Sequence, residues 1–263
     1  MKLRVLFSVT MLSLLAACQD SPAGRSQLIL LPDSMMTDLG HEAFAEMKRQ
    51  QIIETNPAIN AFVRCVSEHV IEAAGRVYAA ESMPASWEVV VFDNPQPNAF
   101  ALPGGKIGVH TGMLRLVETP DQLAAVIGHE VGHVLADHGN ERMTQQLGIQ
   151  SVLYVVGLVS EGEGQRLLME ALGIGSQLGI ALPFSRAHER EADLIGLNIM
   201  ATAGFEPKQS VSLWRNMAAA GGGQPLEFLS THPAHETRIE RLEAQMQAAL
   251  TLYQAASPAT CAR

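Results

Sequence analysis

Residues 119–135 read TPDQLAAVIGHEVGHVL and carry the most informative pattern in the chain. Thr119 and Gln122 have the spacing of a helix capping box, and Pro120 stands at the first helical position, where a missing N–H costs nothing. Apolar residues then recur at helical spacing, which indicates a buried face. They are Leu123, Val126, Ile127, Val131, Val134 and Leu135. The stretch therefore predicts an amphipathic helix with one face in the core.

The two histidines of this helix, His129 and His133, flank Glu130 in an HExxH pattern. Residues four apart lie on the same helix face, one turn above the other. Two imidazoles placed in this way can bind one Zn²⁺, and the glutamate between them can act as a general base on a water molecule there. His138 follows His133 by five residues, so on a continuous helix it points away from this face. We expect His138 to be structural or exposed rather than a ligand.

A catalytic zinc site needs a third protein ligand and an open fourth position. Residues 185–193 read SRAHEREAD, and Glu189 and Asp193 again share one helix face. Glu189 can bind the metal while Asp193 accepts a hydrogen bond from a ligand histidine and fixes its tautomer. The alternative is a solvated charge cluster, which is disfavoured because the histidine pair needs a carboxylate partner. Glu191 points away from that face and is a weaker candidate.

The rest of the chain predicts an α+β fold that is mainly helical, with a small β-sheet beside the HExxH helix. Residues 38–53 and 57–77 have helical spacing, and residues 86–92 are rich in β-branched side chains. Two short strands are expected around the turn Pro103-Gly104-Gly105, at 99–102 and 106–110. From Pro120 onward nearly all signals are helical. Within that part, charged residues interrupt the apolar segment 151–184, which favours packed or interfacial helices over a membrane hairpin.

Composition supports one folded domain. Of the 263 residues, 47% are apolar and 17% are charged, which suffices for a packed core. The net charge is −9, and scattered Lys and Arg residues argue against a nucleic-acid partner. We expect the domain to cover residues 33–255, with a tether at 18–32 and a C-terminal tail at 256–263.

The N-terminus predicts export. Residues 1–17 combine a positively charged start with a short apolar stretch, as in a secretory signal peptide. Leu15-Ala-Ala-Cys18 resembles a bacterial lipobox, which implies a lipid on Cys18. Gln19 in place of Asp then implies the periplasmic face of the outer membrane. In that oxidising compartment Cys65 and Cys261 either form a disulfide that ties down the tail or remain unpaired.

Four motifs together resemble one family. HEVGH at 129–133, EREAD at 189–193, NAFALPGG at 98–105 and THP at 231–233 are similar to the HExxH/ExxxD gluzincin metallopeptidases. That family includes CAAX prenyl proteases, HtpX-like membrane proteases and soluble bacterial lipoprotein peptidases. The resemblance covers about residues 38–245 and implies a zincin-like metallopeptidase domain with one zinc ion per chain. It assigns the metal to His129, His133 and Glu189, the general base to Glu130, and a supporting role to Asp193.

The resemblance also places His232 and Arg238 near the metal. In the lipoprotein branch the matching histidine can occupy the open metal position and keep the enzyme latent, which makes His232 a candidate fourth ligand. The alternative is that His232 merely caps a helix over residues 234–249. For the oxyanion that forms during peptide hydrolysis, Arg238, His232 and His235 all remain candidates.

Residues Asn98, Ala99, Phe100 and Ala101 resemble the edge strand on which such peptidases bind an extended substrate. The family then implies an endopeptidase acting on unfolded or misassembled envelope proteins. A different class of function is a zinc-stabilised periplasmic chaperone or assembly factor with little or no proteolysis. A third possibility is a lipoprotein that only holds metal in a closed four-ligand site. Glu130 argues against the chaperone, because a pure scaffold needs no base beside the metal. For the metal-holding lipoprotein, a closed site of four protein ligands would be support, and three protein ligands plus water would not.

Overall fold

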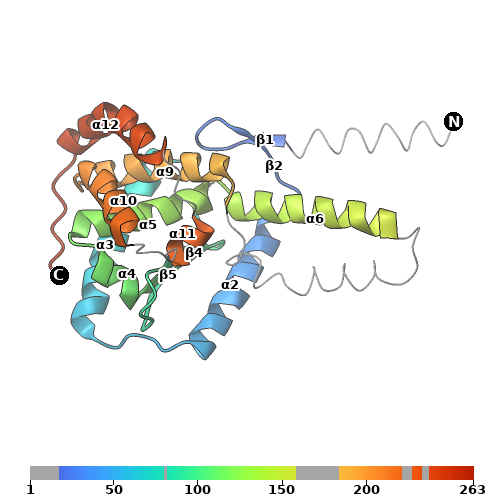
Figure 1. The fold of residues 1–263 in the computed structure, drawn as a ribbon, viewed down its shortest axis with the longest axis horizontal. Coiled ribbons are helices and arrows are strands. Elements are labelled where there is room, and N and C mark those ends of the chain that lie inside the picture. The colour runs from blue at the N-terminus through green and yellow to red at the C-terminus, as the bar shows by residue number, and fades with distance from the viewer. Residues whose placement is uncertain (1–17, 80–81, 158–183, 221–226, 233–236) are drawn as a thin grey trace.

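The computed structural model describes residues 18–79, 82–157, 184–220, 227–232 and 237–263. Helices dominate this part of the chain, as the sequence predicts (Figure 1). They are α2 (Asp33–Gln50), α3 (Pro57–Val77), α4 (Thr111–Leu116), α5 (Pro120–Leu135), α6 (His138–Gly157), α9 (Arg186–Thr202), α10 (Lys208–Ala220), α11 (Glu227–Thr231) and α12 (Thr237–Ala255). None of the described helices is long and apolar enough to cross a membrane. Most of the segment expected as packed or interfacial helices, 151–184, lies outside the described residues.

The HExxH helix is α5, and it begins as its sequence predicts. The Thr119 hydroxyl accepts a hydrogen bond from the Gln122 N–H, at 3.2 Å. The reciprocal half of the capping box differs from the expectation, because the Gln122 side chain accepts from the Glu118 N–H at 2.9 Å rather than from that of Thr119. The first bond satisfies an N–H group that a helix start leaves without a partner, and the second ties the residue before the cap to the first turn.

A small three-stranded sheet has the strand order β3-β5-β4. Strands β3 (Glu88–Phe92) and β5 (Lys106–His110) are parallel, and β4 (Ala99–Leu102) runs antiparallel to β5. The strands β4 and β5 have the bounds that the sequence predicts. Beyond β3 the chain at 52–54 adds two backbone hydrogen bonds, from Glu54 N–H to Val91 O and from Asp93 N–H to Ile52 O. β4 therefore occupies the opposite edge of this sheet.

Helix α5 lies in the centre and packs closely against α9 (Figure 1). The approach depends on glycines: a Cβ at Gly196 of α9 would lie 2.7 Å from the His129 backbone N. A Cβ at Gly132 of α5 would lie 2.9 Å from the Ala192 carbonyl oxygen. Real Cβ atoms do not approach this closely, so larger residues would push the helices apart. This contact brings the HExxH face of α5 against the start of α9.

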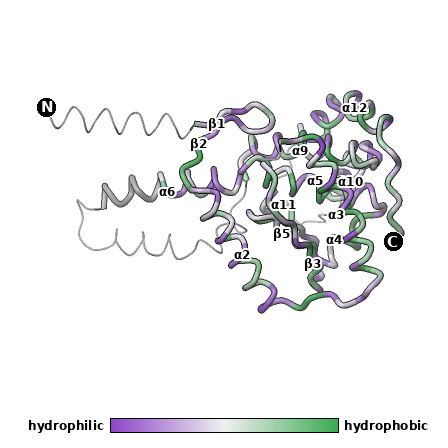
Figure 2. Tube along the Cα trace, turned by 180° about the vertical axis from the view of Figure 1, so that it is seen from behind, coloured by the Kyte–Doolittle hydropathy of each residue, from purple (hydrophilic) through white to green (hydrophobic). Residues whose placement is uncertain are grey.

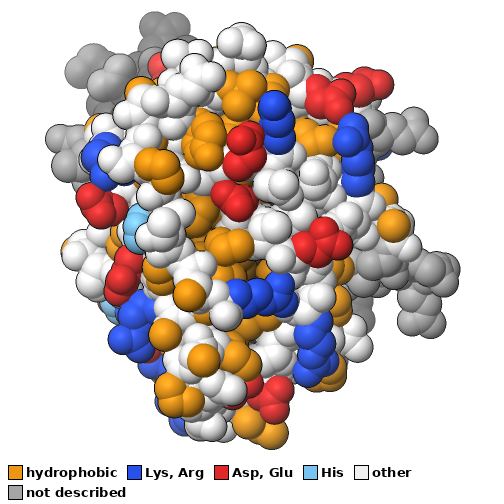
Figure 3. Space-filling view, turned by 90° about the vertical axis from the view of Figure 1, so that its left-hand side faces the viewer, with side chains coloured by type: hydrophobic (Ala, Val, Ile, Leu, Met, Phe, Trp, Pro, Cys, Tyr) orange, Lys and Arg blue, Asp and Glu red, His pale blue; other side chains and the backbone are white. Residues whose placement is uncertain are grey.

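The remaining helices cover this pair. Helix α12 lies on α9 and α10 and alternates hydrophilic with hydrophobic residues, as expected when one side faces the core (Figure 2). On the face drawn in Figure 3, basic and acidic side chains are interspersed with hydrophobic ones.

Both ends of the described chain are fastened to the domain. The segment 18–32, expected to be a tether, instead contains a hairpin of β1 (Cys18–Asp20) and β2 (Ser26–Leu28). Its Arg25 forms ion pairs with Glu141 of α6 and Glu191 of α9. A polar, small-residue composition indicated a free segment, but it could not reveal these distant partners. At the other end, a disulfide joins Cys65 of α3 to Cys261 in the tail.

Candidate metal centre

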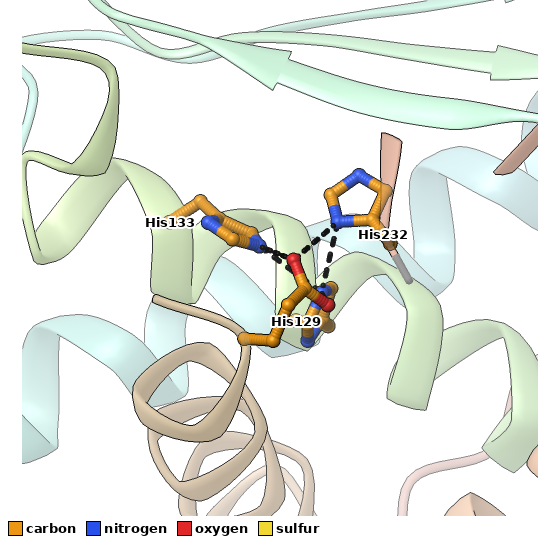
Figure 4. Close-up of side chains that lie close together, drawn as sticks. His129, His133 and His232 are labelled. Atoms are coloured by element: carbon orange, nitrogen blue, oxygen red, sulfur yellow. Dashed lines mark hydrogen bonds and ion pairs between the residues drawn. The ribbon is translucent and has the colours of Figure 1, made fainter. Parts of the chain in front are cut away.

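Four buried side chains from three parts of the fold converge beside α5 (Figure 4). His129 and His133 come from α5, Glu189 comes from the first turn of α9, and His232 directly follows α11. Their donor atoms all lie within 4.8 Å of one another, and each side chain is at most 5% exposed. The structure thus brings together the three ligands proposed from the sequence and the proposed fourth.

The distances show donor atoms facing a common centre. The Nε2 atoms of His129 and His133 are 3.1 Å apart, and His232 Nδ1 lies 3.2 Å from His129 Nε2. Glu189 Oε1 lies 3.3 Å from His133 Nε2 and 3.1 Å from His232 Nδ1. Neutral imidazoles with lone pairs directed at one another repel unless a proton or cation lies between them. Three imidazoles and one carboxylate are a donor set that suits Zn²⁺, so the residues present fit this ion.

The electrostatics of Glu189 agree with a cation site. Burial alone would raise the pKa of this carboxyl, but the three surrounding histidines hold it well below its usual range. Glu189 is therefore ionised, which is the state in which a carboxylate binds a cation.

Glu130 lies next to this cluster and contacts the edge strand. Its Oε2 accepts a hydrogen bond from the Ala101 N–H of β4 at 3.2 Å. Its Oε1 lies 3.4 Å from His232 Nε2 and has no hydrogen bond among the described residues. Burial raises the pKa of Glu130, which moves the carboxyl toward the range that suits a general base.

Asp193 and Arg238 support the ligands from behind. His129 Nδ1 lies 3.1 Å from Asp193 Oδ1, which leaves Nε2 facing the cluster, as the sequence predicts for Asp193. Arg238 donates to Asp193 at 2.5 Å and to Glu189 at 2.7 Å. Its guanidinium also lies over the Trp214 ring, 3.4 Å from the centroid. Arg238 thus holds two carboxylates in place, and both of its terminal nitrogens are engaged. His235, another candidate for stabilising the oxyanion, lies outside the described residues.

His138 lies outside the four-residue cluster, as expected for a structural residue rather than a ligand, but it does not point away from His133. Its side chain is fully buried, and its Nδ1 lies 2.9 Å from His133 Nδ1, so it contacts a candidate ligand. The helical-wheel argument failed because α5 ends at Leu135. Asp137 then adopts a positive φ of 50°, and His138 begins a new helix. Glu191, the weaker ligand candidate, contacts the other ring nitrogen of His138 and lies outside the four-residue cluster.

A cavity of about 150 Å³ opens beside the cluster, between α2, β4 and the start of α6. His133, Ala101 and Leu102 line its inner end, and Phe184 closes one side with its ring stacked on His133 at 3.9 Å between centroids. Sequence reasoning did not identify Phe184, because an isolated phenylalanine carries no spacing signal.

Comparison with known proteins now identifies the family. Residues 57–246 match the model of peptidase family M48. The chain belongs to this family. The match includes α5, α9 and His232, and therefore all four residues of the cluster.

Named relatives are mitochondrial and bacterial. The chain is 38% identical to the mitochondrial metalloendopeptidase OMA1 of Schizosaccharomyces pombe over 178 residues, which cover 66% of this chain and 51% of that protein. It is 31% identical to OMA1 of Saccharomyces cerevisiae over 249 residues, covering 88% and 69%. It is 28% identical to the beta-barrel assembly-enhancing protease of Escherichia coli over 169 residues, covering 61% and 34%. The matches thus span from about a third to about two thirds of these relatives.

Proposed function

We propose that this protein is a zinc-dependent endopeptidase that cleaves unfolded or misassembled polypeptides of the cell envelope. One observation carries the proposal: the Glu130 carboxylate lies between the four-residue cluster and the backbone of an edge strand. A metal site, a base and a surface for an extended chain therefore meet at one carboxylate. A site that only stores metal needs neither the base nor the strand.

In peptide-bond hydrolysis, the metal and the side chains of this protein would have different roles. His129, His133 and Glu189 would hold Zn²⁺, which polarises a peptide carbonyl and lowers the pKa of a water molecule when bound. Glu130 accepts a proton from the attacking water through Oε1 and later delivers it to the leaving amine. The Ala101 N–H fixes the other oxygen of Glu130 and so orients the carboxylate. Asp193 and Arg238 keep the His129 ring and the Glu189 carboxylate in position.

The register of β4 supports substrate binding at its free edge. The His110 N–H donates to Asn98 O, which makes these two residues a hydrogen-bonded pair of the antiparallel ladder. Bonded and non-bonded pairs alternate, so the backbone groups of Ala99 and Ala101 point away from β5. The bond from the Ala101 N–H to Glu130 agrees with this direction. An extended peptide adding to this edge would place its backbone next to the base.

The conformation supports the proposal of a latent resting state. His232 Nδ1 contacts His129 and Glu189 as a fourth donor. Helix α11 is tied across the site, because the Phe228 N–H donates to Pro97 O and the Thr231 carbonyl accepts from the Phe184 N–H. Movement of α11 and His232 would open the fourth metal position.

The proposed location is supported by the N-terminal sequence. The proposed substrate class is supported by the name of a relative. A lipid on Cys18 would anchor the chain at the periplasmic face of the outer membrane, and Cys18 is also the first residue of β1 in the hairpin. The name of the E. coli relative, beta-barrel assembly-enhancing protease, supports envelope proteins as the substrate class.

The test compares the purified mature chain with Glu130→Gln against unfolded casein, with added zinc and with a chelator. We expect cleavage by the wild type that the chelator abolishes, and zinc binding without cleavage by the variant. Equal cleavage by the variant would refute the role of Glu130. Stoichiometric zinc with no cleavage, also after His232→Ala, would favour the chaperone function.

A further inference from the structure

Beyond the four donors, a continuous chain of polar contacts leads from His133 to the N-terminal hairpin. His133 Nδ1 lies 2.9 Å from His138 Nδ1, and His138 Nε2 lies 3.1 Å from Glu191 Oε2. Arg25 Nε donates to the same Glu191 oxygen at 2.7 Å. His138, Glu191 and Arg25 are called the His133 relay below. The sequence argument weighed His138 and Glu191 only as weak ligand candidates and gave neither of them nor Arg25 a role at the site.

The donor and acceptor roles of these side chains decide which ring nitrogen carries the proton in each contact. The Glu191 carboxylate can only accept, so His138 Nε2 carries the proton. In a neutral imidazole the Nδ1 of His138 is then a bare acceptor, and His133 Nδ1 supplies the hydrogen between the two rings. His133 consequently presents an unprotonated Nε2. That is the atom that faces His129 and Glu189 in the cluster.

The His138 and Glu191 side chains are buried, so water does not compete for their hydrogen bonds. The His138 side chain is 0% exposed and that of Glu191 is 4% exposed. The Ser21 hydroxyl of the hairpin donates to the second oxygen of Glu191. Arg25 also pairs with Glu141 at 2.6 Å, so the guanidinium is held by two carboxylates from α6 and α9. The hairpin thus fixes Glu191 through two of its own side chains.

We propose that the His133 relay positions the metal ligand His133 and selects its tautomer, and that the N-terminal hairpin is for this reason part of the metal centre. The inference rests on the proposed zinc site. Asp193 and Arg238 contact His129 on one side of the cluster. The relay contacts His133 on the other side. His138 and Glu191 are positioning residues, since neither contacts the proposed metal position.

The experiment measures the zinc affinity of the full mature chain by competition with a chromophoric chelator. His138→Leu removes the acceptor for His133, while His138→Asn keeps an amide group near the Nδ1 position. Loss of such a partner lowers metal affinity by about 10–100-fold. We expect a loss of this size in His138→Leu, recovery of most of it in His138→Asn, and a smaller loss in Arg25→Met.

His188→Leu is the matched control. His188 is a buried histidine that stacks on His138 at 4.4 Å between centroids and bonds to Glu141 at 3.0 Å, but it has no hydrogen bond to His133 among the described residues. We expect its zinc affinity to fall much less than that of His138→Leu, because His188 contacts the relay but makes no bond to the ligand. Equal losses in His188→Leu and His138→Leu would overturn the relay, because loosening of the interior would then explain both.

A second readout is the protonation of the rings. In the zinc-loaded wild type, ¹⁵N chemical shifts should show a proton on His133 Nδ1 and one on His138 Nε2. A proton on His138 Nδ1 would overturn the inference. Failure of the relay is distinguishable from failure of the proposed function. If the wild type binds zinc and cleaves casein while His138→Leu binds zinc equally well, only the relay is wrong; if the wild type binds no zinc, the metal centre itself is wrong.

Discussion

His232 fills the fourth donor position of the cluster, and its Nε2 lies 3.4 Å from the Glu130 carboxylate. His232→Ala removes this group and leaves His129, His133 and Glu189 to hold zinc. One charge-assisted hydrogen bond contributes about 1.5 kcal/mol, which corresponds to about tenfold in a rate or equilibrium. We expect casein cleavage to rise by about that factor, measured as initial rates at equal zinc loading. The double variant with Glu130→Gln should be inactive, and an unchanged rate in His232→Ala would rule out latency through this residue.

Individual site residues differ in how far the sequence could reveal them. His129 and His133 share one helix, so their spacing alone places them side by side. Arg238 lies 109 positions from His129, and only the family resemblance placed it near the metal. His138 was expected to be structural, but its contact with His133 was not foreseen, because the helix breaks between the two residues. Asp137 adopts a positive φ at that break.

Asp137, in the turn that follows helix α5, gives a prediction about how stability depends on pH. Burial and the nearby Asp33 raise the pKa of Asp137 from 3.8 to about 6. The folded protein therefore holds this proton more tightly than the unfolded chain, and its stability falls as pH rises from about 4 to 6. We expect Asp137→Asn to stabilise the protein by about 1–2 kcal/mol above pH 6, after allowing for partial exposure. Asn also tolerates a positive φ.

The measurement is urea unfolding of both proteins at several pH values. The gain should be absent below about pH 4, grow up to pH 6 and stay constant above it. Asp121→Asn, at the opposite end of α5, serves as the control. Asp121 accepts a hydrogen bond from the Glu206 N–H and lies at the positive end of the helix dipole, so its loss should destabilise. A gain of equal size at pH 4 and pH 7 would contradict the assigned cause.

The elements themselves were predicted with unequal success for a physical reason. Strands β4 and β5 follow from local residue types and a glycine turn, and they have the predicted bounds. The hairpin of β1 and β2 was missed because residues 18–28 carry no alternating apolar pattern, and its docking involves Arg25 pairing with Glu141 and Glu191, more than a hundred residues away. Local patterns cannot report partners at that separation. Contacts of this kind fasten both ends of the described chain.

At the scale of the whole molecule, the C-terminal tail packs against the domain. The Ala259 N–H donates to Gly204 O, and Arg263 donates to the carbonyls of Val117 and Leu114. The disulfide between Cys65 and Cys261 closes a loop with a sequence separation of 196 residues. The sequence left open whether these cysteines pair, because spacing along the chain does not show that two Cα atoms come together.

The size of that loop makes the disulfide a stability element for the entire domain. Cross-links that close long loops restrict the unfolded chain strongly, and removing a native one typically costs about 2–5 kcal/mol. We expect Cys65→Ala/Cys261→Ala to lower the free energy of unfolding by this amount in urea titrations. Zinc affinity should not change, because α3 and the tail carry none of the proposed ligands. Reducing agent should destabilise the wild type and leave the double variant unaffected. A reductant effect of equal size in both proteins would show that the stabilisation has another source.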